Sequence, residues 1–259
     1  MDGHDSWKES CISPMPVMLT STSLNNYVYS YCWNENVGHE FFRSASMELT
    51  KDVHLLNSSL KQAFCDPEVC ALRDHVYMET FPEIFSYNPE RDQWFNETPM
   101  NILDNNKNYP IMMADNICNV LYMFSTNGYF QVYDNRISKW LVLPKLKGYC
   151  YSGCIHQGKI HVLNENPCSV GLFDPRKNTW QIIDSGNKKL REDKLVSYQS
   201  KLWAVGKHDD YCNVRLGIGI FDEYFQNWNC RVLNCNSLFK KQSYSSHQAS
   251  FQVKQAIVF

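Results

Sequence analysis

Four tryptophans recur at similar intervals along the chain, and each ends a segment of the same design. Trp94, Trp140, Trp180 and Trp228 lie 46, 40 and 48 residues apart, each with an aromatic residue seven positions earlier. The segments read YNPERDQW, YDNRISKW, FDPRKNTW and FDEYFQNW. The Asn or Asp after the aromatic can hydrogen-bond to its own backbone, and Pro, where present, presets a turn φ. Each segment therefore predicts a strand end, a tight turn and the next strand.

A second pattern recurs at about the same interval: an apolar stretch, a short polar turn and another apolar stretch. Its copies are TSLNNYVYS, CALRDHVYM, ICNVLYMF, CIHQGKIHVL, SYQSKLWAV and FQVKQAIVF. Pairs such as Gln157-Gly158 suit tight hairpins, because Gly tolerates a positive φ. The two patterns make four short strands per roughly 45 residues, the size of one propeller blade. An antiparallel sandwich is the alternative, but it does not require the same aromatic-to-Trp spacing four times.

The sequence thus predicts an all-β fold, a propeller of four-stranded blades with five blades plus an incomplete sixth. The first blade is degenerate, because Phe42 is followed seven residues later by Leu49 instead of Trp. The sixth unit stops after two strands, so we expect an open or poorly closed ring. Residues 1–16 are expected to form a disordered leader, and 17–259 the propeller. The expected blades are 17–60, 61–104, 109–147, 148–188, 189–233 and a partial one at 244–259.

These repeats resemble kelch repeats. The matching features are the aromatic, Asn or Asp, Pro turn followed by Trp, as in Tyr87-Asn88-Pro89 with Trp94, and the later phrase Thr98-Pro99-Met100. The resemblance covers nearly the whole chain from about residue 17. Kelch units usually carry a Gly-Gly doublet that is missing here, and the chain has only 11 glycines. The sequence therefore resembles a divergent member.

Divergent propellers of this kind look like those of the kelch-like, or BTB-kelch, family. In that family, BTB and BACK domains precede the propeller, the BTB domain recruits a cullin scaffold, and the propeller captures the substrate for ubiquitination. This chain has no room for either domain, so cullin recruitment is implied only for a longer parent. The resemblance implies a protein–protein interaction module, the substrate-recognition propeller of a ubiquitin ligase adaptor. A cytoskeletal or scaffold kelch protein without a ligase link is the alternative.

The connections between second and third strands are expected to be loops on one face of the propeller. Variable loops on a constant scaffold are where recognition usually lies. The longest is KHDDYCNVR, at 207–215. Tyr and Arg often dominate interfaces, although a long polar loop can also be simply solvated. The predicted partner-binding residues are His208, Asp209, Asp210, Tyr211 and Arg215.

The composition of the chain indicates which classes of partner and which cellular compartment are favoured. The formal net charge is −2, which does not favour nucleic-acid binding. No run of 18 apolar residues predicts a transmembrane helix, and the polar N-terminus does not read as a secretory signal. The 11 cysteines cannot all pair within the chain. Reduced thiols in a cytoplasmic or nuclear protein are the expectation.

Catalysis and metal binding are not favoured. Cys150, Cys154, His156 and His161 resemble a zinc site on paper. The first three share one face of an expected strand, however, and His161 holds a position where sister repeats carry Tyr or Trp, so packing is the preferred interpretation. The common hydrolase, P-loop, zincin and dinucleotide-binding motifs are absent. The sequence predicts no enzyme, no cofactor and no metal, with a metal-dependent oxidase as a third hypothesis.

Overall fold

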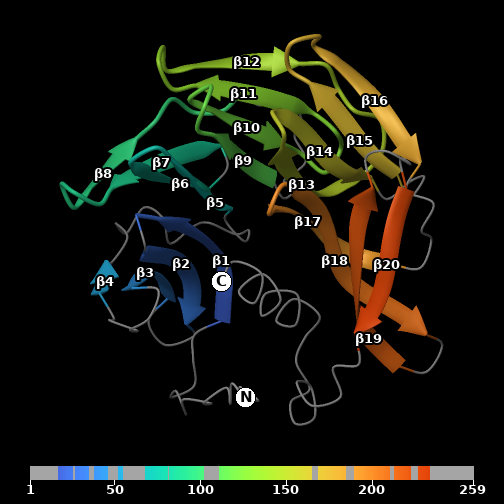
Figure 1. Cartoon of the computed structure of the whole chain (residues 1–259). Helices are drawn as coiled ribbons and strands as arrows, with labels where there is room; N and C mark the ends of the chain where they lie inside the picture. Colours follow the sequence, from blue (N-terminus) through green and yellow to red (C-terminus); the bar gives the residue numbers. More distant parts are fainter. Residues whose placement is uncertain are drawn as a thin grey trace.

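The computed structural model in Figure 1 consists of twisted antiparallel sheets arranged around a common centre. It describes residues 17–25, 27–34, 38–45, 52–54, 68–80, 82–101, 111–164, 169–184, 190–210, 213–222 and 227–233. Within these residues, twenty strands form five four-stranded sheets. No helix in this part of the chain is long and apolar enough to span a membrane.

We number the sheets 1 to 5 in chain order. Sheet 1 contains β1 (Val17–Leu24), β2 (Tyr27–Asn34), β3 (Gly38–Ala45) and β4 (Asp52–His54). Sheet 2 contains β5 (Val69–Leu72), β6 (His75–Thr80), β7 (Glu83–Asn88) and β8 (Gln93–Asn96). Sheet 3 contains β9 (Ile111–Asp115), β10 (Val120–Phe124), β11 (Phe130–Asp134) and β12 (Lys139–Leu143). Sheet 4 contains β13 (Cys150–His156), β14 (Lys159–Asn164), β15 (Ser169–Asp174) and β16 (Thr179–Asp184). Sheet 5 contains β17 (Leu190–Tyr198), β18 (Lys201–Asp210), β19 (Asn213–Asp222) and β20 (Asn227–Leu233).

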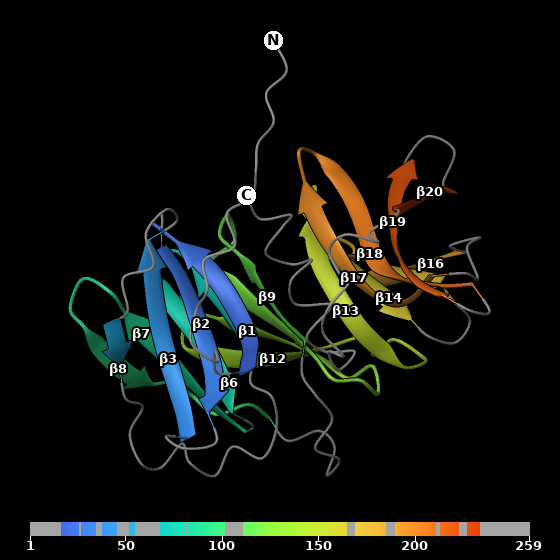
Figure 2. The same ribbon diagram turned by 90° about the horizontal axis from the view of Figure 1, so that it is seen from below.

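Every sheet is a simple meander whose strands pair in sequence order. Consecutive sheets contact each other through their first strands, β1 with β5, β5 with β9, β9 with β13 and β13 with β17. The fourth strands, such as β12 and β16, lie on the outside (Figure 1). Sheets 1 and 5 stand apart in Figures 1 and 2, and no contact of similar extent joins β17 to β1 within the described residues.

The all-β class and the four-stranded propeller blades are confirmed. The predicted count of five blades and a partial sixth is not shown, because the described residues contain five sheets and no sixth. The expected sixth unit at 244–259 and the expected leader at 1–16 both lie outside the described residues.

The repeated aromatic-to-Trp segment is one hairpin used four times. All four tryptophans lie on fourth strands, where each is the direct cross-strand partner of the aromatic seven positions earlier: Tyr87 with Trp94, Tyr133 with Trp140, Phe173 with Trp180 and Phe221 with Trp228. In the first three pairs the ring centroids are 5.0, 5.1 and 5.0 Å apart. Such aromatic cross-strand pairs stabilise a hairpin beyond the area they bury.

The polar residue after the aromatic closes the turn, as the sequence predicts. The Oδ1 atom of Asn88 accepts hydrogen bonds from the backbone N–H groups of Glu90 and Arg91, at 3.0 and 3.1 Å. Asp134 and Asp174 each accept one such hydrogen bond at Oδ1, from the backbone N–H of Arg136 and of Arg176. The residue two before the tryptophan then takes a positive φ, of 51° at Asp92, 51° at Ser138 and 54° at Asn178.

The apolar core lies between neighbouring sheets. Leu72 and Tyr77 of sheet 2 share one buried cluster with Leu121 and Tyr133 of sheet 3. Larger rings fill the next interface, where Phe130 of sheet 3 lies 5.0 Å from Phe173 of sheet 4, edge to face. Because each sheet buries apolar side chains against its neighbour, the sheets hold one another in place, and the connections at their ends can vary.

Candidate protein-interaction face

The meander topology gives each sheet two different ends. The tight turns between first and second strands and between third and fourth strands lie at one end, which we call the turn face. The connections between second and third strands, and those from one sheet to the next, lie at the other end, which we call the loop face. Contacts at the turn face align the sheets: the backbone N–H of Arg73 donates to Asn116 Oδ1, and His156 Nδ1 lies 2.8 Å from Ser197 Oγ.

Four of the five predicted binding residues lie in the paired strands of a hairpin at the loop face, and the expectation of a nine-residue loop is corrected. His208, Asp209 and Asp210 lie in β18, and Arg215 lies in β19. In the antiparallel register, His208 lies opposite Arg215 and Asp210 lies opposite Asn213, so strand pairing continues almost to the tip of the hairpin. Polar residues do not end a strand when the partner strand still supplies backbone hydrogen bonds. Tyr211 lies outside the described residues, and the role of all five in binding stays a prediction.

The connection between β10 and β11 is a fixed part of the loop face. The N–H of Gly128 donates to the Ser125 carbonyl at 2.9 Å, and the N–H of Tyr129 donates to Ser125 Oγ at 3.0 Å. Gly128 has a φ of +79°, and a Cβ atom there would lie 1.9 Å from the carbonyl oxygen of Leu146. Only glycine allows this approach, in which the N–H of Leu146 donates to the Gly128 carbonyl at 3.0 Å.

The linker from β12 to β13 lies beside this connection. The N–H of Cys150 donates to the Thr126 carbonyl at 2.9 Å, and Asn164 Nδ2 donates to the Lys147 carbonyl at 2.6 Å. Gly148, with a φ of +109°, packs against that Asn164 amide. Hydrogen bonds from two neighbouring segments therefore fix the backbone of a linker that has no regular secondary structure.

This fixed linker presents aromatic and basic groups to solvent. Tyr149 is 59% exposed, and Lys145 and Lys147 are also exposed. The ammonium of Lys145 lies 3.8 Å from the centroid of the Tyr129 ring, a cation–π contact that orients both side chains. Exposed tyrosines on rigid backbone are favourable for recognition, because they offer a large contact area at little entropic cost. We name Tyr129, Lys145, Lys147 and Tyr149 the linker patch.

The linker patch was not predicted from the sequence, because the repeat pattern directs attention to connections within repeats and not to those between them. A signal was present in the sequence LPKLKGYC, where Pro144 and Gly148 flank two lysines and precede Tyr149. Pro and Gly mark a connection, and an aromatic residue placed directly after such a Gly is not part of the alternating strand pattern.

The four residues with zinc-like spacing all lie in β13 and β14 of sheet 4. Cys150, His156 and His161 are buried, and Cys154 is the cross-strand partner of His161. Burial raises the pKa of the Cys150 and Cys154 thiols to about 12, so both are protonated at neutral pH. No group of three or more His, Cys, Asp or Glu residues in the described part of the chain is arranged to hold a metal ion.

Comparison with known proteins supports a kelch-like propeller. No family model matches the chain. Residues of the chain are similar to Kelch-like protein 35 of Mus musculus, with 29% identity over 101 residues, which is 37% of this chain and 17% of that protein. The chain thus matches about a sixth of the length of this relative. Together with the four-stranded sheets, this similarity confirms the resemblance to kelch-like propellers.

The architecture is also shared with a solved structure. A chain of the crystal structure of a nidogen/laminin complex superposes with a TM-score of 0.61, covering 84% of this chain and 80% of that chain. The sequence identity is 10%, so this likeness concerns the fold alone.

Proposed function

We propose that the chain is a non-enzymatic protein-interaction module that binds a partner protein at its loop face. The observation that carries the proposal is the linker patch, where Tyr149 and Lys145 project from backbone that hydrogen bonds hold in place. The β18–β19 hairpin lies on the same face and adds His208, Asp209, Asp210 and Arg215 to the proposed surface. The similarity to a kelch-like protein supports this use of the propeller.

We further propose that the module supplies substrate recognition to a cullin-RING ubiquitin ligase, through a BTB domain outside this chain. Similarity to Kelch-like protein 35 supports the proposal. The proposed compartment is the cytoplasm or the nucleus, which suits the free thiols of Cys70, Cys118, Cys150 and Cys154.

Affinity purification from human cells with quantitative mass spectrometry tests the loop face. The tagged chain is compared with Y149A/K145A and with the matched control Y198A, which truncates an exposed tyrosine at the turn face. We expect a set of proteins that Y149A/K145A loses and Y198A retains. Identical protein sets for all three forms would contradict the proposed binding face.

The ligase role has a separate readout. Proteins that depend on Tyr149 should accumulate in cells when cullin neddylation is inhibited, because a ubiquitination substrate is then spared. Unchanged abundance of these proteins would contradict the ligase role and favour the scaffold alternative, while leaving the binding face intact.

We also propose that residues 244–259, which include FQVKQAIVF, contribute strands that help to close the ring. Support comes from the repeat pattern of this segment, two apolar stretches around a polar turn, and from the separation of sheets 1 and 5 in the described residues. A chain that ends at residue 243 should then melt at a lower temperature than the full chain. Equal melting temperatures would contradict this role.

A further inference from the structure

Two aliphatic side chains project from neighbouring turns on the turn face, away from the linker patch. Ile117, in the turn between β9 and β10, is 90% exposed, and Ile137, in the turn between β11 and β12, is 56% exposed. A single exposed aliphatic residue needs no explanation. These two belong to adjacent hairpins of sheet 3, and the N–H of Asn135 donates to the Asn119 carbonyl at 3.3 Å, which joins the two turns.

Hydrogen bonds within sheet 3 and from the neighbouring sheet 2 fix both turns. Asp115 Oδ1 accepts the backbone N–H groups of Ile117 and Cys118, at 2.9 and 3.0 Å. From sheet 2, the hydroxyl of Tyr77 donates to Asn135 Oδ1 at 3.0 Å. Ile117 and Ile137 therefore project from ordered backbone, which lowers the entropic cost of binding a ligand there.

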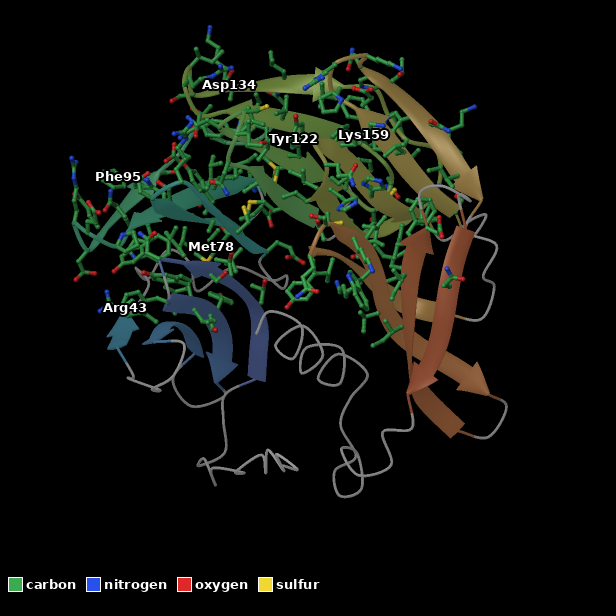
Figure 3. All side chains as sticks on the ribbon, in the orientation of Figure 1. Arg43, Met78, Phe95, Tyr122, Asp134 and Lys159 are labelled. Atoms are coloured by element: carbon green, nitrogen blue, oxygen red, sulfur yellow. The ribbon has the colours of Figure 1, made fainter. Side chains whose placement is uncertain are left out.

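The acidic and basic side chains around the two isoleucines differ in their exposure to solvent. The carboxylate of Asp134, a residue labelled in Figure 3, is 13% exposed and accepts two hydrogen bonds from the guanidinium of Arg136, at 2.8 and 2.6 Å, while Arg136 itself is 65% exposed. Asp115 is buried, and its carboxylate caps its own turn. The acids of sheet 3 thus face inward, and the base faces solvent.

Sheet 4 extends this basic rim. Arg176 and Lys177 are exposed in the turn between β15 and β16, and Asp174 caps that turn by accepting the N–H of Arg176 at 3.0 Å. Sheet 4 packs directly against sheet 3 through β13 and β9, so this turn belongs to the neighbouring sheet on the same face. Neither Arg176 nor Lys177 forms an ion pair within the part of the chain that the structure describes.

We propose that this turn patch, made of Ile117, Ile137, Arg136, Arg176 and Lys177, binds an acidic peptide segment that carries a large aliphatic residue. The outward basic groups complement carboxylates, and the two isoleucines provide apolar contact between them. The three basic side chains of the patch are exposed, whereas the nearby carboxylate of Asp115 is buried and that of Asp134 is 13% exposed. The patch lies on the face opposite the linker patch, so the inference goes beyond the proposed function.

Two other occupants fit the patch less well. A second copy of the chain docking symmetrically would bring the basic rim of one copy against that of the other, which is repulsive. Nucleic acid would gain little from Ile117 and Ile137, because phosphate groups prefer polar and basic contacts. The combination of basic and aliphatic side chains selects an acidic, partly apolar peptide.

Fluorescence anisotropy with three labelled peptides and the full chain tests the assignment. The probes are EDEELEDE, the same peptide with Gly in place of Leu, and the charge-reversed KRKKLKRK. We expect EDEELEDE to bind, to weaken as salt is raised from about 50 to about 300 mM, and to bind at least about fivefold more tightly than the Gly peptide. KRKKLKRK should not bind.

Variants locate the site. We expect R176E/K177E and I117S/I137S each to weaken EDEELEDE binding by about tenfold or more, since each removes one component of the patch. K147E, a charge reversal on the loop face, should bind as the unaltered chain does, and so should Y149A/K145A. Matching thermal unfolding curves show that the variants remain folded.

Three results would overturn the inference. The first is equal binding of EDEELEDE by the chain and by both turn-patch variants. The second is equal binding of the Leu and Gly peptides. The third is a concentration-dependent dimer that I117S/I137S abolishes, because the patch would then serve a second copy of the chain. None of these results bears on the linker patch, which has its own test in Y149A/K145A.

Discussion

Trp140 donates its indole N–H to the carbonyl oxygen of Thr98 at 2.8 Å, and Thr98 lies four residues after Trp94, the equivalent tryptophan of the preceding sheet. Trp180 repeats this relationship, with a 2.7 Å hydrogen bond to the carbonyl of Pro144, four residues after Trp140. Each of these two tryptophans thus pairs with an aromatic of its own sheet and donates to the backbone of the connection that follows the preceding sheet. The repeated Trp is a link between sheets.

Truncating this link should destabilise the fold. We expect W140A to lower the free energy of unfolding by about 3–5 kcal/mol, because Trp140 is buried against sheet 2. W140F keeps part of the ring packing but leaves the Thr98 carbonyl without its donor, so a smaller loss of about 1–3 kcal/mol is expected. Urea denaturation of both variants measures the difference. A loss below about 1 kcal/mol for W140A would contradict the linking role.

The turn before Trp180 offers a test of backbone conformation. Asn178 has a φ of 54°, a region that Asn tolerates and β-branched residues avoid. N178V should therefore cost about 1–2 kcal/mol of stability, whereas N178G should cost less than about 0.5 kcal/mol. K177V is the matched control, since Lys177 is exposed in the same turn without a positive φ, and it should change little. Thermal unfolding distinguishes these outcomes, and equal effects of N178V and K177V would refute the explanation.

The repeat made most of the fold predictable. Tyr133 and Trp140 are seven residues apart and form one hairpin, so a local pattern in the sequence was enough to place them as partners. The hydrogen bond from Trp140 to Thr98 joins residues 42 positions apart, and no local pattern in the sequence indicates it. Non-local contacts of this kind depend on how two sheets meet, which no single repeat encodes.

The candidate sites were less accessible to sequence reasoning. The polar segment around His208 and Arg215 reads as a loop, but its backbone groups pair across the hairpin, and side-chain polarity carries no information about that pairing. The linker patch depends on Gly128 lying against Leu146, a contact between two connections. The apolar character of Ile117 would predict burial, but Ile117 is exposed, because the turn directs its side chain away from the core.

The cysteines should differ in reactivity in the folded protein. Cys118 is exposed, whereas Cys70 and Cys150 are buried. At pH 7.5 a thiol reagent should therefore label Cys118 well before these two, as peptide mapping of partly labelled protein can show. In denatured protein prepared with thiols blocked during isolation and without reductant, titration should account for close to all 11 cysteines as thiols. Several disulfides would contradict the expected compartment.

Asp115 should slow the reaction of Cys118. Although Cys118 is exposed, desolvation by neighbouring atoms raises the pKa of its thiol, and a hydrogen bond to the Asp115 carboxylate raises that pKa further. D115N keeps an oxygen that can cap the turn but removes the charge, so the pKa should fall and the thiolate fraction should increase. We expect faster labelling of Cys118 in D115N near neutral pH. An unchanged or slower rate, with the turn intact, would contradict this electrostatic coupling.

Stability should decline at alkaline pH because buried tyrosines resist ionisation. Burial raises the pKa of Tyr122 to about 12, and nearby Asp115 adds to the shift. The unfolded chain ionises tyrosine near pH 10, so between about pH 10 and 12 the unfolded state loses protons that the folded state retains. The free energy of unfolding should be unaffected by this group below about pH 9 and should fall as the pH rises through that window.

Y122F removes the ionisable group while keeping the ring. Its stability should therefore fall less steeply between about pH 10 and 12 than that of the unaltered chain, with the two curves parallel at neutral pH. Urea midpoints measured across this range provide the comparison. Tyr133, whose pKa burial also raises to about 12, should give the same trend in Y133F, together with a pH-independent loss from its 2.8 Å hydrogen bond to Glu97. Equal slopes for all three proteins would show that these tyrosines do not control alkaline unfolding.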